Sequence, residues 1–221
     1  MPYIVREGRR VINNIQSAAS LFLVKTIFSV VLTLFSLITS SAYPFVPVQL
    51  TVIGACAVGI PSFILSLEPT YSRIQGNFLS TVFRKAAAGA FTVVLQVALA
   101  TLICKILGST SEVRATHCML AAGITSLFMI ARVFPLETVL RKVVYYGMFV
   151  LFFGILIAMP AFFELEDIGL RETVFLLSVT LLTPAILGVM EQIINWMGTA
   201  AGKMRTKFSR NRKRRTVSGQ N

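Results

Sequence analysis

Six stretches of about 20 apolar residues with few charges constrain this chain more than any other feature, because each is long enough to cross a bilayer as a helix. In hydrocarbon, a helix satisfies its backbone hydrogen bonds within its own segment. Of the 221 residues, 55% are hydrophobic and only 14% are charged, which excludes an ordinary soluble domain. We expect an all-α, polytopic membrane protein with six spans: Ala18 to Thr39, Phe45 to Leu67, Ala86 to Leu107, Ala115 to Phe134, Val143 to Phe163 and Thr173 to Trp196.

Lysine and arginine are distributed unequally between the two sides of these spans. The amino-terminal segment and the two loops on the same side of the spans carry nine basic residues: Arg6, Arg9, Arg10, Arg73, Arg84, Lys85, Arg132, Arg141 and Lys142. The loops on the opposite side carry only Lys105, Arg114 and Arg171. Positive residues are retained in cytoplasmic loops, so we expect both termini to be cytoplasmic and the protein to lie in the plasma membrane. Short outer connections predict that the six helices pack as three antiparallel hairpins.

The chain is expected to have three parts. Residues 1–17 form a cytoplasmic amphipathic stalk that continues into the first span, residues 18–197 form the six-helix transmembrane domain, and residues 198–221 form a basic cytoplasmic tail. The net charge of +12 raises nucleic-acid binding as an alternative. A basic segment directly after a last span is attracted to anionic headgroups, however, so we expect the lipid bilayer as its partner and no nucleic acid.

Two ionisable residues within the spans are candidates for an ion pathway, because a charge at the bilayer centre costs roughly 2.5 to 3.5 kcal/mol. Lys25 lies about two turns into the first span, where its ammonium either faces the bundle interior as a fixed cation or extends to the interface. Glu191 lies close to Trp196, so its carboxylate either contributes to the pathway or reaches the headgroup region.

The second span contains Gly54, Gly59 and Pro61 within eight residues. Proline removes a helical hydrogen bond, so this segment is expected to kink or unwind. Broken helices in membranes either line a cavity or coordinate an ion, whereas a glycine-rich kink can also serve close packing alone. His117 and the three cysteines have no metal-site spacing, so no metal ligand is assigned firmly.

Two linked sequence blocks resemble the middle of a P-type cation-transporting ATPase. Their residues are most similar to those of the bacterial branch related to calcium pumps. The matching positions are Glu7, Gly8, Arg9, Asn13 and Asn14 in the first block, and Pro47, Gln49, Leu50, Gly59, Pro61, Glu68 and Pro69 in the second. The resemblance implies that the six spans correspond to the fifth to tenth membrane helices of such a pump. It covers nearly the whole chain, although beyond Lys85 it rests on the order of spans.

The resemblance also shows departures at the ion site. Calcium-pump-related members are expected to place carboxylate and amide ligands in the fifth and sixth helices. The corresponding positions here are Thr26 and Ser29, with Lys25 adjoining, and Gly54, Ala57 and Val58. Side-chain oxygen ligands for a hard dication are therefore largely missing. Backbone carbonyls of residues 54–61 and the two hydroxyls are the expected ligands, and the transported cation is either monovalent or divalent.

The complete family uses ATP and Mg²⁺, but this chain has no Asp-Lys-Thr-Gly, Thr-Gly-Glu or Gly-Asp-Gly motif, so no catalytic residue and no cofactor is assigned. Whether the chain belongs to an enzyme stays open at this point. We expect the carboxyl-terminal ion-pathway portion of a pump, either as a split gene product whose amino-terminal part is a separate partner chain, or as a truncated product or fragment. The alternatives are an independent six-span permease and a non-enzymatic membrane assembly partner.

Purified chain incubated with ATP and Mg²⁺ is expected to form no acid-stable phosphoenzyme, because the acceptor carboxylate and phosphate-binding groups are missing from it. Acid precipitation after incubation with labelled ATP measures this directly. Incorporation of label into the purified chain would contradict the interpretation.

Overall fold

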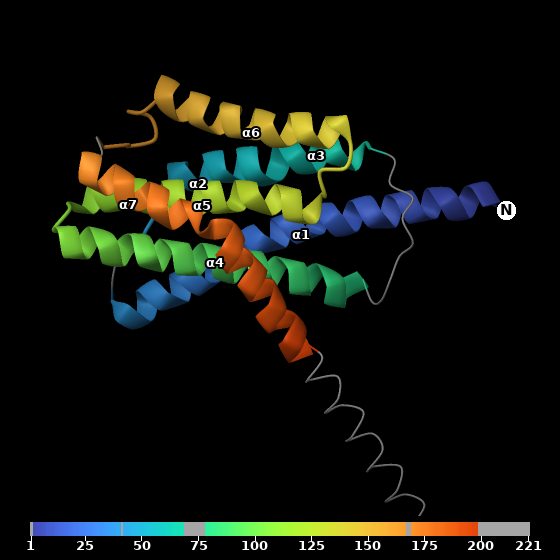
Figure 1. The fold of residues 1–221 in the computed structure, drawn as a ribbon, viewed down its shortest axis with the longest axis horizontal. Helices are drawn as coiled ribbons and strands as arrows, with labels where there is room; N and C mark the ends of the chain where they lie inside the picture. Colours follow the sequence, from blue (N-terminus) through green and yellow to red (C-terminus); the bar gives the residue numbers. More distant parts are fainter. Residues whose placement is uncertain (1, 41, 69–77, 167–168, 199–221) are drawn as a thin grey trace, which may run out of the picture.

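The computed structural model describes residues 2–40, 42–68, 78–166 and 169–198 (Figure 1). Within these ranges the chain is helical and contains no strand. Six helical stretches are long and apolar enough to cross a membrane: Val5–Thr39, Pro47–Ser66, Leu79–Leu107, Ser111–Val133, Val139–Ala158 and Leu170–Gly198. The expected all-α, six-span architecture is therefore confirmed. Pro69 and the expected tail beyond Gly198 lie outside the described residues.

The first span belongs to one unbroken helix, α1, which runs over Pro2–Thr39. No glycine or proline follows Gly8 within it, so nothing in the sequence interrupts the helical hydrogen bonds between the expected stalk and the span. Large apolar side chains near its far end remain open to the surroundings, with Leu37 75% and Ile38 80% exposed. In a bilayer such side chains are in contact with lipid.

The second span is divided into α2 (Pro47–Ile53), a π-helical segment η1 (Gly54–Gly59) and α3 (Ile60–Ser66). The expected distortion takes the form of a wider helical turn, in which the Ile60 N–H reaches back to the Ala55 carbonyl. Pro61 follows directly and has no N–H to donate, so the preceding turn loses one backbone donor. Such π-turns in helices frequently mark functional positions.

Helix α4 (Phe78–Leu107) packs against both α1 and α5 (Ser111–Val133), and α5 is the most buried of the spans. The buried face of α4 contains Ala86, Ala87, Ala88 and Ala90, and small residues let membrane helices approach closely. A short turn joins α4 to α5, where Gly108 adopts φ 70° and the Ser109 N–H donates to the Cys104 carbonyl at 3.0 Å. This is the glycine-dependent helix end that permits a compact connection.

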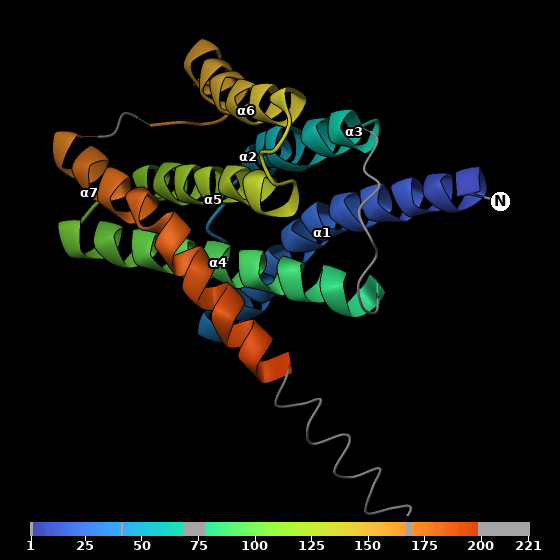
Figure 2. The same cartoon turned by 45° about the vertical axis from the view of Figure 1, so that its right-hand side comes forward.

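The last two spans do not pack as the expected hairpin. Helix α6 (Val139–Ala158) packs against α3, η1 and α5, whereas α7 (Leu170–Leu181) packs against α4 and α5. Figure 2 shows α6 and α7 on different sides of α5. After a turn at Leu182, the sixth span continues as a helix over residues 183–198 and crosses α4 diagonally. Pro184 lies at the start of this second helical stretch and cannot donate the hydrogen bond that would keep the helix straight.

One end of the bundle holds the starts of α1, α4 and α6 and the ends of α3 and α5 (Figure 1). It carries Arg10, Arg84, Arg132 and Arg141, and we call it the basic end. From the distribution of lysine and arginine, we expect this end to face the cytoplasm.

Gly123→Ala is expected to destabilise the protein, because a Cβ at Gly123 would overlap the ring of Phe152, which is itself fully buried. Overpacking of this kind costs about 1 to 3 kcal/mol. Thermal unfolding in detergent measures the effect. Gly154→Ala on α6 is the matched control, since a Cβ there meets open space, and an equal loss of stability in both variants would contradict the packing argument.

Candidate functional site

The ammonium group of Lys25 lies against the backbone of Gly54 at the start of η1. A Cβ on Gly54 would overlap Lys25 Nζ, so the glycine leaves room for the Lys25 side chain in this orientation. The Lys25 side chain is half-buried, and within the described ranges no residue accepts a hydrogen bond from it or forms an ion pair with it. Of the two possibilities left open for Lys25, the structure shows the side chain directed at the second span.

The η1 segment supplies backbone oxygens beside this charge. Cys56, Ala57 and Val58 are all buried, and a Cβ on Gly59 would approach the Gly54 carbonyl oxygen to 3.4 Å. Because Pro61 has no N–H, the buried turn before it has a carbonyl without its usual helical donor. The structure thus places the Lys25 ammonium against Gly54, whose carbonyl oxygen faces Gly59 one turn further along η1.

The hydroxyl candidates of α1 are engaged elsewhere. Thr26 is exposed and its Oγ1 donates to the Phe22 carbonyl of its own helix at 3.1 Å. Ser29 forms a side-chain hydrogen bond with Tyr43 in the loop after α1. Burial raises the pKa of Tyr43, and its hydrogen bonds to Ser29 and Thr33 act in the opposite direction. These contacts tie the loop to α1 rather than directing the hydroxyls at η1.

Glu191 lies far along the sixth span and faces α5 at the basic end. Its carboxylate is 3.7 Å from Arg132 Nη1, and both side chains remain partly exposed. Asn195, one turn further, accepts a hydrogen bond from Arg84 at 3.4 Å. The structure therefore gives Glu191 an interhelical contact and does not place it beside Lys25. Exposed pairs of this kind contribute little to stability.

Gln49 of the second sequence block is fully buried and connects distant parts of the chain. Its Oε1 accepts from the Val46 N–H at 3.2 Å, which caps the start of α2, and its Nε2 donates to the Phe163 carbonyl at 3.1 Å. Leu50 packs against the hydrophobic core, and Pro47 occupies the first turn of α2, where its missing N–H is tolerated. The Pro-x-Gln-Leu pattern thus starts the second span and anchors it to the connection after α6.

Asn14 and Glu68, one from each sequence block, meet at the basic end. Asn14 Nδ2 donates to the Ser66 carbonyl at 2.6 Å and to the Glu68 carbonyl at 3.0 Å. The Glu68 carboxylate accepts from Arg141 Nε at 2.6 Å and from Thr138 Oγ1 at 2.7 Å. Nearby, Glu7 pairs with Arg10 at 3.1 Å, whereas Gly8 contacts nothing that restricts a side chain there.

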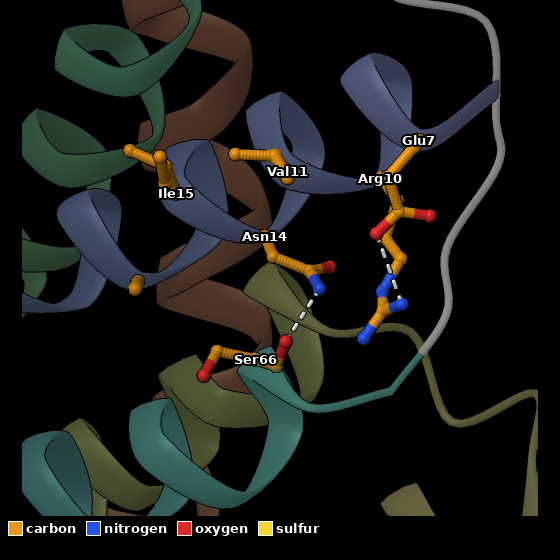
Figure 3. A pocket seen from close by; sticks show the side chains of 7 residues that line it. Glu7, Arg10, Val11, Asn14, Ile15 and Ser66 are labelled. Carbon is orange, nitrogen blue, oxygen red and sulfur yellow. Dashed lines mark hydrogen bonds and ion pairs between the residues drawn. The ribbon is translucent and has the colours of Figure 1, made fainter. Parts of the chain in front are cut away.

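A cavity of about 390 Å³ opens beside these contacts, between α1 and the end of α3. Figure 3 shows the Asn14 amide directed at Ser66 and the Glu7–Arg10 pair at its rim. Val11 and Ile15 line its apolar part and are about half exposed. Among the described residues, no three His, Cys, Asp or Glu side chains come together as a metal site here or elsewhere.

The sequence interpretation missed the polar contacts that join α4 to the sixth span. Gln96 Nε2 donates to the Val179 carbonyl at 3.1 Å and to Thr183 Oγ1 at 2.8 Å, and both Gln96 and Thr183 are fully buried. A glutamine in the middle of an apolar span and the Thr183-Pro184 pair were the available signals. Arg141 was also counted only for topology, although it is buried and paired with Glu68.

No family model matches the chain, but it is similar to curated bacterial transporters. A Mycolicibacterium smegmatis protein named calcium-transporting ATPase CtpE is 30% identical over 207 residues, which cover 86% of this chain and 26% of that protein. A Streptococcus pneumoniae protein named probable cation-transporting ATPase exp7 is 35% identical over 105 residues, 44% of this chain and 14% of that protein. The CtpE protein of Mycobacterium bovis is 40% identical over 96 residues, 39% of this chain and 12% of that protein.

The chain thus spans about a quarter or less of the length of these relatives. The names of these relatives agree with the resemblance of the two sequence blocks to cation-transporting ATPases. The six apolar helices fit the membrane part of such a protein.

Gln49→Leu is expected to lower the free energy of unfolding by about 1 to 3 kcal/mol, because it leaves the Val46 N–H and the Phe163 carbonyl without their buried partner. Denaturation in detergent, followed by circular dichroism, measures the change. Gln16→Leu, on the half-buried side of α1, is the control. Equal effects of the two substitutions would contradict a bridging role for Gln49.

Proposed function

We propose that this chain forms the carboxyl-terminal, ion-pathway portion of a P-type cation-transporting ATPase, in the plasma membrane with both termini cytoplasmic. The similarity to CtpE over 207 residues and the six spans support this proposal. The observation that carries it is the contact of Lys25 with Gly54 at the π-helical turn. A charged residue at this depth, beside a distorted helix, is typical of ion pathways in membrane proteins.

The charge of Lys25 would govern how a cation binds beside η1. Two unit charges about 6 Å apart interact by about 3 kcal/mol at an effective dielectric constant of about 20. A transported cation is therefore repelled unless carboxylates or backbone oxygens compensate. Backbone oxygens are available at η1, and in the part of the chain that the structure describes no carboxylate pairs with Lys25. We propose Lys25 as the residue that tunes cation affinity, with Gly54, Ala57, Val58, Gly59 and Pro61 shaping the pathway.

ATP hydrolysis belongs, in this proposal, to parts of the pump that correspond to the uncovered length of the relatives. ATP and Mg²⁺ would act there, and an amino-terminal part would supply the phosphorylation and nucleotide-binding groups. Thr26, Ser29 and Glu191 remain candidates for the pathway, and in the described conformation their polar groups contact Phe22, Tyr43 and Arg132.

Lys25→Met is expected to lower the cation concentration for half-maximal ATP hydrolysis by up to about 100-fold in the complete pump, because removal of the nearby positive charge removes about 3 kcal/mol of repulsion. Lys25→Arg should leave this value nearly unchanged. Cation-dependent ATP hydrolysis in membrane vesicles measures both variants. Lys105→Met is the matched control, because Lys105 lies in the last turn of α4, away from the basic end. A similar shift in Lys105→Met, or no shift in Lys25→Met, would contradict the role of Lys25 in tuning cation affinity.

Reconstitution separates the pump from an independent permease. Protein purified from its source membranes by affinity for this chain should show cation-stimulated ATP hydrolysis. It should also form an acid-stable phosphoenzyme on an amino-terminal part that is either associated with the chain or continuous with it. Liposomes that contain only the 221-residue chain should show no cation flux. Rapid flux in those liposomes without ATP would instead support the permease.

A further inference from the structure

Hydrogen bonds at the basic end form a continuous chain from α1 to α6. It starts at Asn14 of α1, which donates to the carbonyls of Ser66 and Glu68 where α3 ends. It continues from the Glu68 carboxylate to Thr138 and Arg141 in the first turn of α6. Asn14, Glu68 and Arg141 are 6%, 9% and 7% exposed, so water has little access to compete for these bonds.

Glu68 is the central residue because both its backbone and its side chain are engaged. Its carbonyl oxygen accepts from α1, and its two carboxylate oxygens accept from α6. The Thr138 hydroxyl also makes two contacts, since it donates to the Glu68 carboxylate and accepts from the Arg141 N–H at 3.4 Å. Arg141 Nη1 also donates to the Pro135 carbonyl at 3.1 Å, which holds the guanidinium in one orientation.

Helices α1 and α6 are connected by packing mainly through the neighbours that they share. Helix α1 packs against α3, η1, α4 and α5, whereas α6 packs against α3, η1 and α5. A displacement of α1 relative to the bundle therefore reaches α6 through shared neighbours or through Glu68. Charge-assisted bonds such as Arg141–Glu68 are short and directional, so they resist separation more than apolar contacts do.

We propose that Asn14, Glu68 and Arg141 form a relay that carries displacement of the α1 stalk to the first turn of α6. Asn14 is a positioning residue that acts through Glu68 and touches no transported ion. The relay rests on the proposed function only for the source of the displacement, which would be the ATP-driven part of the pump. It gives one physical role to Asn14 and Glu68, which lie in separate sequence blocks.

Hydrogen exchange of the full chain in lipid nanodiscs tests the relay without any need for transport. The reporters are the amides of Arg141, which donates to Thr138 Oγ1, and Lys142, which donates to the Thr138 carbonyl at 3.2 Å. Asn14→Ala should speed their exchange by about five-fold, a change that corresponds to loss of one hydrogen bond. Glu68→Gln should speed it at least as much.

Ser20→Ala is the matched control, because Ser20 is fully buried on the same helix but donates only to the Gln16 carbonyl. Asn14→Asp is the second variant: it keeps the size of the side chain and removes the donor. If Asn14 acts through Glu68, then Asn14→Ala should have no further effect in a Glu68→Gln background, whereas a local structural role would be additive.

Three results would overturn the relay. The reporter amides could exchange at the native rate in both Asn14 variants while Glu68→Gln speeds them. Ser20→Ala could speed them equally. The Asn14 variants could speed exchange throughout α4 and α5, which would indicate general loosening of the bundle. Because no readout depends on cation transport, failure of the proposed function would leave these results unaffected.

Discussion

The requirement that backbone polar groups be satisfied without water is the constraint on which this structure depends. Within the spans it is met by helical hydrogen bonds, and where a helix stops or bends other donors replace them. Three buried side-chain amides serve this purpose. Asn14 donates to a carbonyl at the end of α3, Gln49 donates to the Phe163 carbonyl after α6, and Gln96 donates to a carbonyl near the bend in the sixth span. Each amide comes from a different span from its acceptor, so the same bonds that satisfy the backbone also join the helices.

These amide contacts give a physical meaning to the resemblance between the two sequence blocks and cation-transporting ATPases. Asn14, Gln49 and Glu68 are matching positions, and all three are buried and bonded between spans. Their place in the two blocks therefore agrees with a role in bundle geometry rather than in direct contact with an ion. Gly54 differs, because its missing side chain makes room for the Lys25 ammonium.

The distribution of charge separates two regions of the bundle. At the basic end, Glu68 and Glu191 are paired with Arg141 and Arg132. Beside η1, the Lys25 ammonium lies close to backbone with no carboxylate partner among the described residues. A buried pair is strongly destabilised when one partner is removed, whereas an isolated charge can respond to a passing ion. The paired charges and the proposed ion pathway thus occupy different levels of the same helices.

The sequence by itself determined the number and approximate bounds of the spans, because apolar length and helical geometry are local properties. It also located the irregular second span, since glycine and proline alter the backbone wherever they occur. Tertiary structure decided that α6 and α7 lie on different sides of α5, and that Arg141 meets Glu68 across 73 positions of chain. It also directed Thr26 and Glu191 away from Lys25. Such pairings depend on helix rotation and crossing angle, which are set by side-chain packing between spans and have no local signature in the sequence.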